Sequence, residues 1–273
     1  MAETLLAEAY GLELEVPALD TGVGACLRDY GEFARPELDF IIASCASGLI
    51  DVGANIGAIC LPFARVRPEA SVVAVEAHPG IAAILRANAA RNGASHVRVV
   101  EAVAAERSAT VDAPVAPLDA PANHGASSLY TKGRPMQRLR AVALDEVAQA
   151  KVDFVKIDVE GFEPRVLQGA GRLLRDVRPT WLVEVSRQRP NTAAEVMQHL
   201  RGAGYRLHWF FSPFLTRKRP RRLDDHPPLR GDLSIVACDS APAWDLRPVE
   251  GDAWPDDVAD FGYLAEYGLR SGR

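Results

Sequence analysis

Cysteine is scarce in this sequence, and its copies are scattered. Four of the 273 residues are cysteines, and they form neither a CxxC pair nor a cluster with histidine: Cys26, Cys45, Cys60 and Cys238. A disulfide framework or a zinc site needs ligands at characteristic spacings, so neither is predicted. Free thiols are typical of a reducing compartment, and we therefore expect a cytoplasmic protein.

Long apolar runs and an excess of positive charge are also missing. No stretch approaches the roughly 18 consecutive apolar residues of a membrane span, and the start MAETLLAEAY lacks the pattern of an export signal. The net charge of −5 disfavours a surface that seeks phosphate backbones. We expect neither a membrane nor a nucleic acid as partner, although residues 217–222 form one basic run.

Short apolar runs are the organising feature of the chain. Each run ends in a polar or glycine-rich turn and is followed by a helix-like stretch, which is typical of a parallel sheet covered by helices on both faces. We predict six such strands and a seventh with an aromatic-rich sequence, at residues 48–52, 71–75, 97–100, 154–157, 181–185, 233–237 and 205–211. Between the second and third, Pro79 and the pair Asn92-Gly93 mark the ends of a helix.

The predicted strands imply a doubly wound, Rossmann-like α/β fold. About twenty residues without helical periodicity join the last two strands, so we expect a hairpin and a final antiparallel strand. Seven strands with the last reversed is the sheet of class I methyltransferases. We predict a mainly helical lead-in at residues 1–47, this domain at 48–238 and a tail at 239–273. Residues 106–140 break the alternation and are expected to pass over the carboxyl edge of the sheet, where ligand loops lie.

The strongest motif is Asp51-Val52-Gly53-Ala54-Asn55-Ile56-Gly57, which closes the first strand and opens a helix. Glycines let the backbone approach a ligand, and unpaired N–H groups attract an anion. The motif departs from the G-x-G-x-x-G fingerprint of dinucleotide sites. S-adenosylmethionine (SAM) fits better, because its carboxylate suits the helix end and its ammonium suits Asp51. A capping aspartate is the plain alternative.

An acidic residue stands at the end of the second predicted strand. Glu76 follows Gly57 by 19 residues, and a carboxylate at that place can accept hydrogen bonds from both hydroxyls of a ribose. This position indicates an adenosine-type cofactor without specifying SAM. The alternative is a solvated charge at the end of a strand.

The fourth predicted strand carries charges into the same edge of the sheet. Alternation places Lys156, Asp158 and Glu160 on one face. Charges on a central strand are costly unless paired or used. Asp158 or Glu160 could take a proton from an acceptor hydroxyl, or two carboxylates could hold a divalent cation that acidifies it. Alternatively, Lys156 forms an ion pair with Glu184 on the next strand, and Asp158 merely touches the cofactor.

Two loops contain weaker candidates. The segment Asn123-His124-Gly125-Ala126-Ser127-Ser128-Leu129 has small and hydroxyl-bearing residues, among them Ser127, that could reach the adenosine or the acceptor, although it is more often a turn. The basic run at 217–222 suggests an acidic acceptor or carrier, while a solvated loop balanced by Asp224 and Asp225 is the slightly favoured alternative.

Taken in order, these segments resemble the FkbM family of SAM-dependent O-methyltransferases. The resemblance spans about residues 30–238 and rests on the Asp51 and Lys156 motifs, on Glu76 with Ala77-His78-Pro79, on the 125–129 segment, and on Val166-Leu167-Gln168-Gly169-Ala170 and Arg178-Pro179 before Glu184. The basic run and the tail after Cys238 depart from the family pattern.

The resemblance implies roles for individual residues. It implies that SAM is bound by Asp51, Gly53, Asn55, Gly57 and Glu76, and that the segment Glu101-Ala102-Val103 lines the adenine. Ala77, Ser127 and Asp158 are also expected to bind the cofactor. It also implies that Asp158 and Glu160 border the transfer site and that Glu32, in Tyr30-Gly31-Glu32, faces the pocket. The expected reaction is methyl transfer to a hydroxyl of a sugar or natural-product-like small molecule. The alternatives are a different acceptor atom or a SAM-binding module without catalysis.

Overall fold

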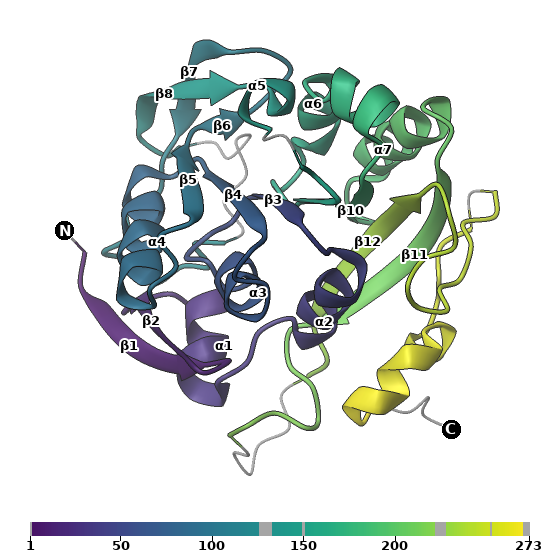
Figure 1. Ribbon diagram of the computed structural model, residues 1–273. Helices are drawn as coiled ribbons and strands as arrows, with labels where there is room; N and C mark the ends of the chain where they lie inside the picture. Colours follow the sequence, from purple (N-terminus) through teal and green to yellow (C-terminus); the bar gives the residue numbers. More distant parts are fainter. Residues whose placement is uncertain (1, 126–132, 149–150, 222–227, 252, 270–273) are drawn as a thin grey trace.

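A seven-stranded sheet crosses the middle of the molecule (Figure 1). The computed structural model describes residues 2–125, 133–148, 151–221, 228–251 and 253–269. All strands are parallel except β12, which lies antiparallel to both of its neighbours. In spatial order the strands are β11 (Arg206–Pro213), β12 (Gly231–Cys238), β10 (Thr180–Val185), β9 (Phe154–Ile157), β3 (Gly48–Val52), β4 (Ser71–Glu76) and β5 (Val97–Glu101).

This topology confirms the predicted doubly wound sheet with one reversed strand. Every predicted strand is present, and the ends differ from prediction by two residues at most. Helix α4 begins at Pro79 and ends at Arg91, directly before Asn92-Gly93, as predicted. The four cysteines are free thiols. In the part of the chain that the structure describes, no helix is long and apolar enough to cross a membrane.

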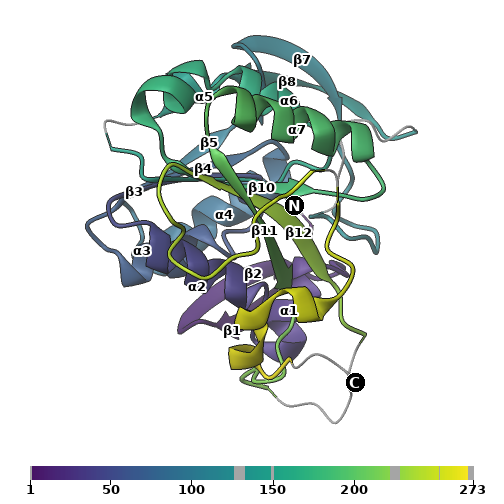
Figure 2. The same cartoon turned by 90° about the vertical axis from the view of Figure 1, so that its right-hand side faces the viewer.

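Helices cover both faces of the sheet (Figure 2). One face packs against α5 (Leu144–Val147), α6 (Glu163–Gln168) and α7 (Pro190–Gly202), and the other against α2 (Arg35–Ser44), α3 (Cys60–Val66) and α4 (Pro79–Arg91). Strand residues alternate between two apolar clusters, so Leu49 joins the α2 side and Ile50 the α7 side. Asp51 therefore points toward the α2 side, where an apolar residue would be expected.

The lead-in opens with a β-hairpin, which the sequence analysis did not predict, before its two helices. β1 (Thr4–Ala9) pairs with β2 (Leu12–Pro17) through Tyr10 and Gly11, which both have positive φ, as tight hairpin turns require. Leu12, Leu14 and Val16 are buried, with exposed or half-buried residues between them. Their period-two alternation is the physical signal for a strand. Helices α1 (Val23–Tyr30) and α2 follow.

Residues 106–140, predicted to pass over the carboxyl edge of the main sheet, contribute to a second, three-stranded sheet. Its order is β6 (Val103–Ala104), β8 (Met136–Val142) and β7 (Ala109–Pro114), with β7 and β8 antiparallel. The two long strands are mostly exposed and bury few apolar residues, such as Leu139. Their sequence consequently lacks a strong strand signal.

The tail folds back on the edge of the main sheet. Residues 258–260 and 262–267 form two short 3₁₀ helices. Trp244 packs against Phe40 and Phe210, while the Tyr263 hydroxyl bonds to both the N–H and the carbonyl of Phe211. The described tail is therefore an ordered cover for β11.

Candidate functional site

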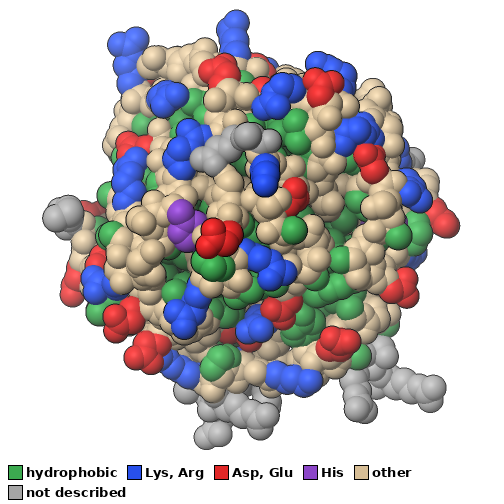
Figure 3. Space-filling view, in the orientation of Figure 1, with side chains coloured by type: hydrophobic (Ala, Val, Ile, Leu, Met, Phe, Trp, Pro, Cys, Tyr) green, Lys and Arg blue, Asp and Glu red, His purple; other side chains and the backbone are tan. Residues whose placement is uncertain are grey.

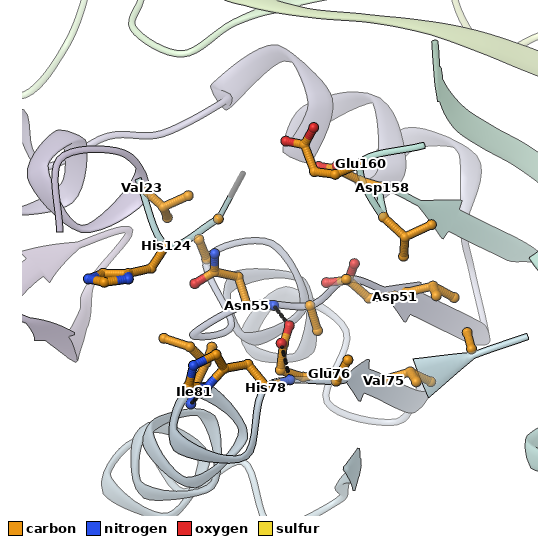
Figure 4. A pocket seen from close by; sticks show the side chains of 18 of the residues that line it. Val23, Asp51, Asn55, Val75, Glu76, His78, Ile81, His124, Asp158 and Glu160 are labelled. Carbon is orange, nitrogen blue, oxygen red and sulfur yellow. Dashed lines mark hydrogen bonds between the residues drawn. The ribbon is translucent and has the colours of Figure 1, made fainter. Parts of the chain in front are cut away.

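A cavity of about 160 Å³ opens at the carboxyl ends of β3, β4 and β9. In doubly wound sheets ligands bind at this edge. Figure 4 shows Asp158 and Glu160 on one side of the cavity, His124 and Val23 on the opposite side, and Asn55 and Glu76 between them. The fold thus brings the separate motifs of the sequence to one place.

The turn after β3 forms the floor of the cavity. Gly53 has a φ of 77°, and a Cβ atom there would lie 1.8 Å from the carbonyl oxygen of Asp158. Only glycine therefore fits between the two strand ends. Asn55 also has a positive φ and lines the cavity. Gly57 does not line the cavity. It has a φ of 94°, and a Cβ atom there would lie 2.6 Å from the Leu61 side chain, so the turn requires glycine at this position.

Glu76 lies at the end of β4 with both carboxylate oxygens engaged. One accepts a hydrogen bond from the Asn55 N–H at 2.9 Å and the other from the His78 N–H at 2.8 Å (Figure 4). Burial raises the pKa of Glu76, and these two backbone bonds partly offset that effect. The carboxylate is thereby fixed toward the cavity, beside Ala77.

The segment after β5 lines the cavity with small apolar residues. Ala102, Val103 and Ala104 all contribute. Glu101 does not, because it lies in an exposed ion pair with Arg86 at 2.8 Å. The side chain of Glu101 thus lies outside the cavity lining, whereas Ala102 and Val103 of the same expected segment belong to it, since neighbouring strand residues point to opposite faces. Ser127 lies outside the described residues, while Asn123, His124 and Gly125 line the cavity.

Lys156 is buried among carboxylates. Its Nζ atom lies 3.5 Å from Asp51, 3.5 Å from Asp158 and 4.0 Å from Glu37 of α2. Burial disfavours the charged ammonium, but Asp51 and Asp158 hold the pKa of Lys156 above its ordinary value. The alternative pairing of Lys156 with Glu184 is wrong, and Glu37 is a partner that the sequence analysis did not identify.

Glu160 and Glu184 share one cation. Arg189 lies 3.1 Å from Glu160 and 3.4 Å from Glu184. Burial, and next the charge of Asp158, raises the pKa of Glu160, while Arg189 lowers it. Glu160 lines the cavity, whereas Glu184 lines a neighbouring one. The carboxylate of Glu163 accepts bonds from the N–H groups of Val159 and Gly161, which fixes the loop carrying Glu160.

Several lining residues come from segments that the sequence analysis did not connect with the site. Phe33 and Phe214 stack with their ring centroids 5.4 Å apart, and Asp232 at the start of β12 lies at the same end. Contrary to the expectation, Glu32 does not line the cavity. Its carboxylate instead accepts bonds from the N–H and hydroxyl of Thr216, which joins the lead-in to the loop after β11.

The basic run packs on the lead-in rather than on the cavity. Arg219 is buried with its guanidinium 4.9 Å from the ring centre of Tyr30, and Arg221 donates a hydrogen bond to the Arg28 carbonyl. None of residues 217–221 lines the cavity, and Arg222, Asp224 and Asp225 lie outside the described residues.

Other described features bear on the remaining partners. Among the described residues, no three His, Cys, Asp or Glu side chains are grouped to hold a metal ion. The described Arg and Lys side chains on the face in Figure 3 are interspersed with Asp and Glu, so that face presents no extended basic surface.

Comparison with solved structures finds methyltransferases that are similar to this chain, one of them with a TM-score above 0.5. Precorrin-6y C5,15-methyltransferase of Geobacter metallireducens GS-15 superposes with a TM-score of 0.51 at 16% identity, covering 76% of this chain and 87% of that one. For methyltransferase FkbM of Methylobacillus flagellatus KT the TM-score is 0.48 at 18% identity, with 70% and 43% covered. For M. jannaschii TYW2, solved with AdoMet, the TM-score is 0.46 at 12% identity, with 87% and 86% covered. At 16% identity, the superposition on the precorrin methyltransferase indicates the fold alone.

Sequence comparison identifies the family. No curated protein matches the chain. The family model described as Methyltransferase FkbM domain matches residues 51–207, which is more than half of the chain. The matched range begins at the Asp51 turn and includes Glu76 and the Lys156 to Glu160 segment. The chain therefore belongs to the FkbM methyltransferase family and is a SAM-dependent methyltransferase.

Proposed function

We propose that this enzyme transfers the methyl group of SAM to a hydroxyl oxygen of a sugar or natural-product-like small molecule. The observation that carries the proposal is the position of Asp158 and Glu160, whose carboxylates border the cavity beside the Asp51 turn. A carboxylate there can receive the proton that a hydroxyl loses as it is methylated.

The residues around the cavity fit SAM. One carboxylate oxygen of Asp51 lies 3.5 Å from Lys156 Nζ, but neither oxygen forms a hydrogen bond, so the carboxylate can still accept from the ammonium group of SAM. Glu76 would accept from the ribose hydroxyls, and Ala102 and Val103 would contact the adenine. The bare backbone at Gly53 permits close approach. SAM supplies an electrophilic methyl group, and the protein's part is to place the acceptor oxygen in line with it.

Between the two carboxylates, Glu160 is the better proton acceptor in this proposal. Its raised pKa brings it nearer to neutral pH, where a general base is most effective. Its backbone has a φ of 54°, an unfavourable region for a side-chain-bearing residue. Such strain persists where the surroundings enforce it, often at functional sites. Asp158, held by Lys156, would orient the acceptor hydroxyl.

The lining of the cavity gives no support to an acidic acceptor. That expectation depended on the basic run, and residues 217–221 do not reach the cavity. The charged lining residues are instead mostly acidic, with Lys156 already surrounded by carboxylates. We therefore place the acceptor among neutral or cationic hydroxyl compounds.

The test is methyl transfer from isotopically labelled SAM to matched panels of sugars, polyols, phenols, amines and carboxylic acids. We expect label in a methyl ether, which survives mild alkali. Label found only in an alkali-labile ester or in a methylamine would assign a different acceptor atom. Transfer that a chelator abolishes would identify the metal-assisted version. SAM binding without transfer to any panel would favour a non-catalytic binding module.

A further inference from the structure

A second cavity lies beside the first, and the two share one residue. It has a volume of about 450 Å³ and is lined by the end of β10, the start of β12 and the C-terminal segment around Pro255 and Phe261. Asp232 lines both cavities. None of the residues expected to bind the cofactor lines the second cavity, so a molecule held there is separate from SAM.

Asp232 belongs to a set of carboxylates that outnumber their cations. The side chains of Asp232, Glu184 and Asp158 point from neighbouring strands toward the α2 side of the sheet. Arg189 is shared by Glu160 and Glu184, and Lys156 by three carboxylates. The Asp232 carboxylate forms neither a hydrogen bond nor an ion pair with any described residue.

Uncompensated carboxylates in a partly buried site are costly unless a ligand uses them. Burial, followed by the charges of Asp158, Glu37 and Glu160, raises the pKa of Asp232 well above its ordinary value. A cation between the two cavities would reverse this effect, whereas an anionic or neutral group would not. The stacked rings of Phe33 and Phe214 line the first cavity, and aromatic faces also attract cations.

We propose that the methyl acceptor carries a protonated amine, which Asp232 binds where the two cavities meet. The hydroxyl to be methylated then extends into the first cavity toward Asp158 and Glu160, and the remainder of the acceptor occupies the second cavity beneath the C-terminal segment. This assignment rests on the proposed function, because it describes the acceptor of the same reaction. It makes the C-terminal segment part of the acceptor site.

The test compares small amines with their acetylated counterparts, in the presence of S-adenosylhomocysteine. Calorimetry would measure the binding of 1,4-diaminobutane and glucosamine, and of N,N′-diacetyl-1,4-diaminobutane and N-acetylglucosamine, in which the positive charge is removed. The variants are Asp232→Asn and, as a control with the same charge change, Asp176→Asn at an exposed position. We expect each amine to bind at least roughly tenfold more tightly than its acetylated form. Asp232→Asn should remove that preference, and Asp176→Asn should leave it unchanged.

Equal binding of amines and acetylated forms, no measurable binding of either amine, or an unchanged preference in Asp232→Asn would overturn the proposal. Thermal melting would verify that each variant is folded, and Glu184→Gln, which should weaken the same preference, serves if Asp232→Asn does not fold. Titration with S-adenosylhomocysteine alone separates the two proposals. If that nucleoside fails to bind, the proposed function fails, while the amine preference can still be measured without it.

Discussion

The Nζ atom of Lys156 on β9 lies 3.5 Å from a carboxylate oxygen of Asp51 on the adjacent strand β3. Both side chains are nearly inaccessible to solvent. Removing one member of such a pair leaves an isolated buried charge, which is more costly than losing the attraction itself. The same ion pair therefore stabilises the sheet and forms part of the site at its edge.

Replacing Lys156 should be strongly destabilising. We expect Lys156→Met to lower the free energy of unfolding by about 3–5 kcal/mol, measured by urea denaturation. The matched control is Arg86→Met, which removes an exposed ion pair with Glu101 and should cost less than about 1 kcal/mol. Similar losses in the two variants would contradict the view that Lys156 neutralises buried carboxylates.

Substituting Gly53 and Gly93 distinguishes the cost of backbone strain from the cost of a steric clash. Both have positive φ, at 77° and 67°, but a Cβ at Gly93 would meet nothing within 4 Å. Gly93→Ala should therefore cost only about 1–2 kcal/mol. Gly53→Ala should cost more and weaken SAM binding as well, because its Cβ would push the ends of β3 and β9 apart. Urea denaturation and SAM titration would measure both effects, and equal behaviour of the two variants would refute the explanation.

The carboxylates proposed to act on the acceptor should affect turnover more than SAM binding. Asp158→Asn and Glu160→Gln are expected to keep most of the SAM affinity and to lose roughly 10²- to 10⁴-fold in rate. Glu195→Gln, at an exposed position of α7, removes the same charge without touching the cavity. Binding is measured by calorimetry and turnover by methyl transfer. Unchanged turnover in both cavity variants would remove the proposed proton acceptor.

The buried Glu37 should make stability depend on pH. Burial is the main cause that raises its pKa to about 7, with Lys156 opposing and Asp158 adding to the effect. The folded state then binds a proton more tightly than the unfolded state. Stability from this group is present below the unfolded pKa and is lost as the pH rises toward 7. The loss amounts to about 3 kcal/mol over that range.

The measurement is urea denaturation of the ligand-free protein and of Glu37→Gln at pH values from 4.5 to 8. The variant lacks the titrating group. The free energy of unfolding of the wild type should therefore fall relative to that of the variant as the pH rises. A difference that stays constant over this range, or shifts in the opposite direction, would contradict the burial effect.

The parallel core of the fold was predictable from the sequence for a physical reason. Strands covered on both faces appear as continuous apolar runs, and Leu49–Val52 and Phe154–Ile157 are of this kind, with Asp51 and Lys156 as the exceptions that mark the site. The peripheral strands gave weaker patterns. In β8, exposed Arg138 and Arg140 flank buried Leu139. The strand therefore has no continuous apolar run that would predict its pairing with β6 and β7.

The candidate site was predictable where its residues follow strand ends. Glu76 and Asp158 are of this kind, since parallel strands end at one edge of the sheet. Phe33, Phe214 and Asp232 come from the lead-in and the last hairpin, which only tertiary packing brings to the cavity. Glu101 lies outside the cavity lining although its neighbour Ala102 belongs to it, because a shift of one residue along a strand turns a side chain to the other face.

The most direct test of the account is calorimetric titration with SAM and S-adenosylhomocysteine, with NAD as a comparison ligand. Glu76→Ala removes the carboxylate proposed to hold the ribose, and Glu69→Ala, at an exposed position, is the matched control. We predict saturable binding of both sulfur nucleosides to the wild type and to Glu69→Ala, binding at least roughly tenfold weaker to Glu76→Ala, and no binding of NAD. Equal affinity of Glu76→Ala, or binding of NAD in place of SAM, would contradict the central claim.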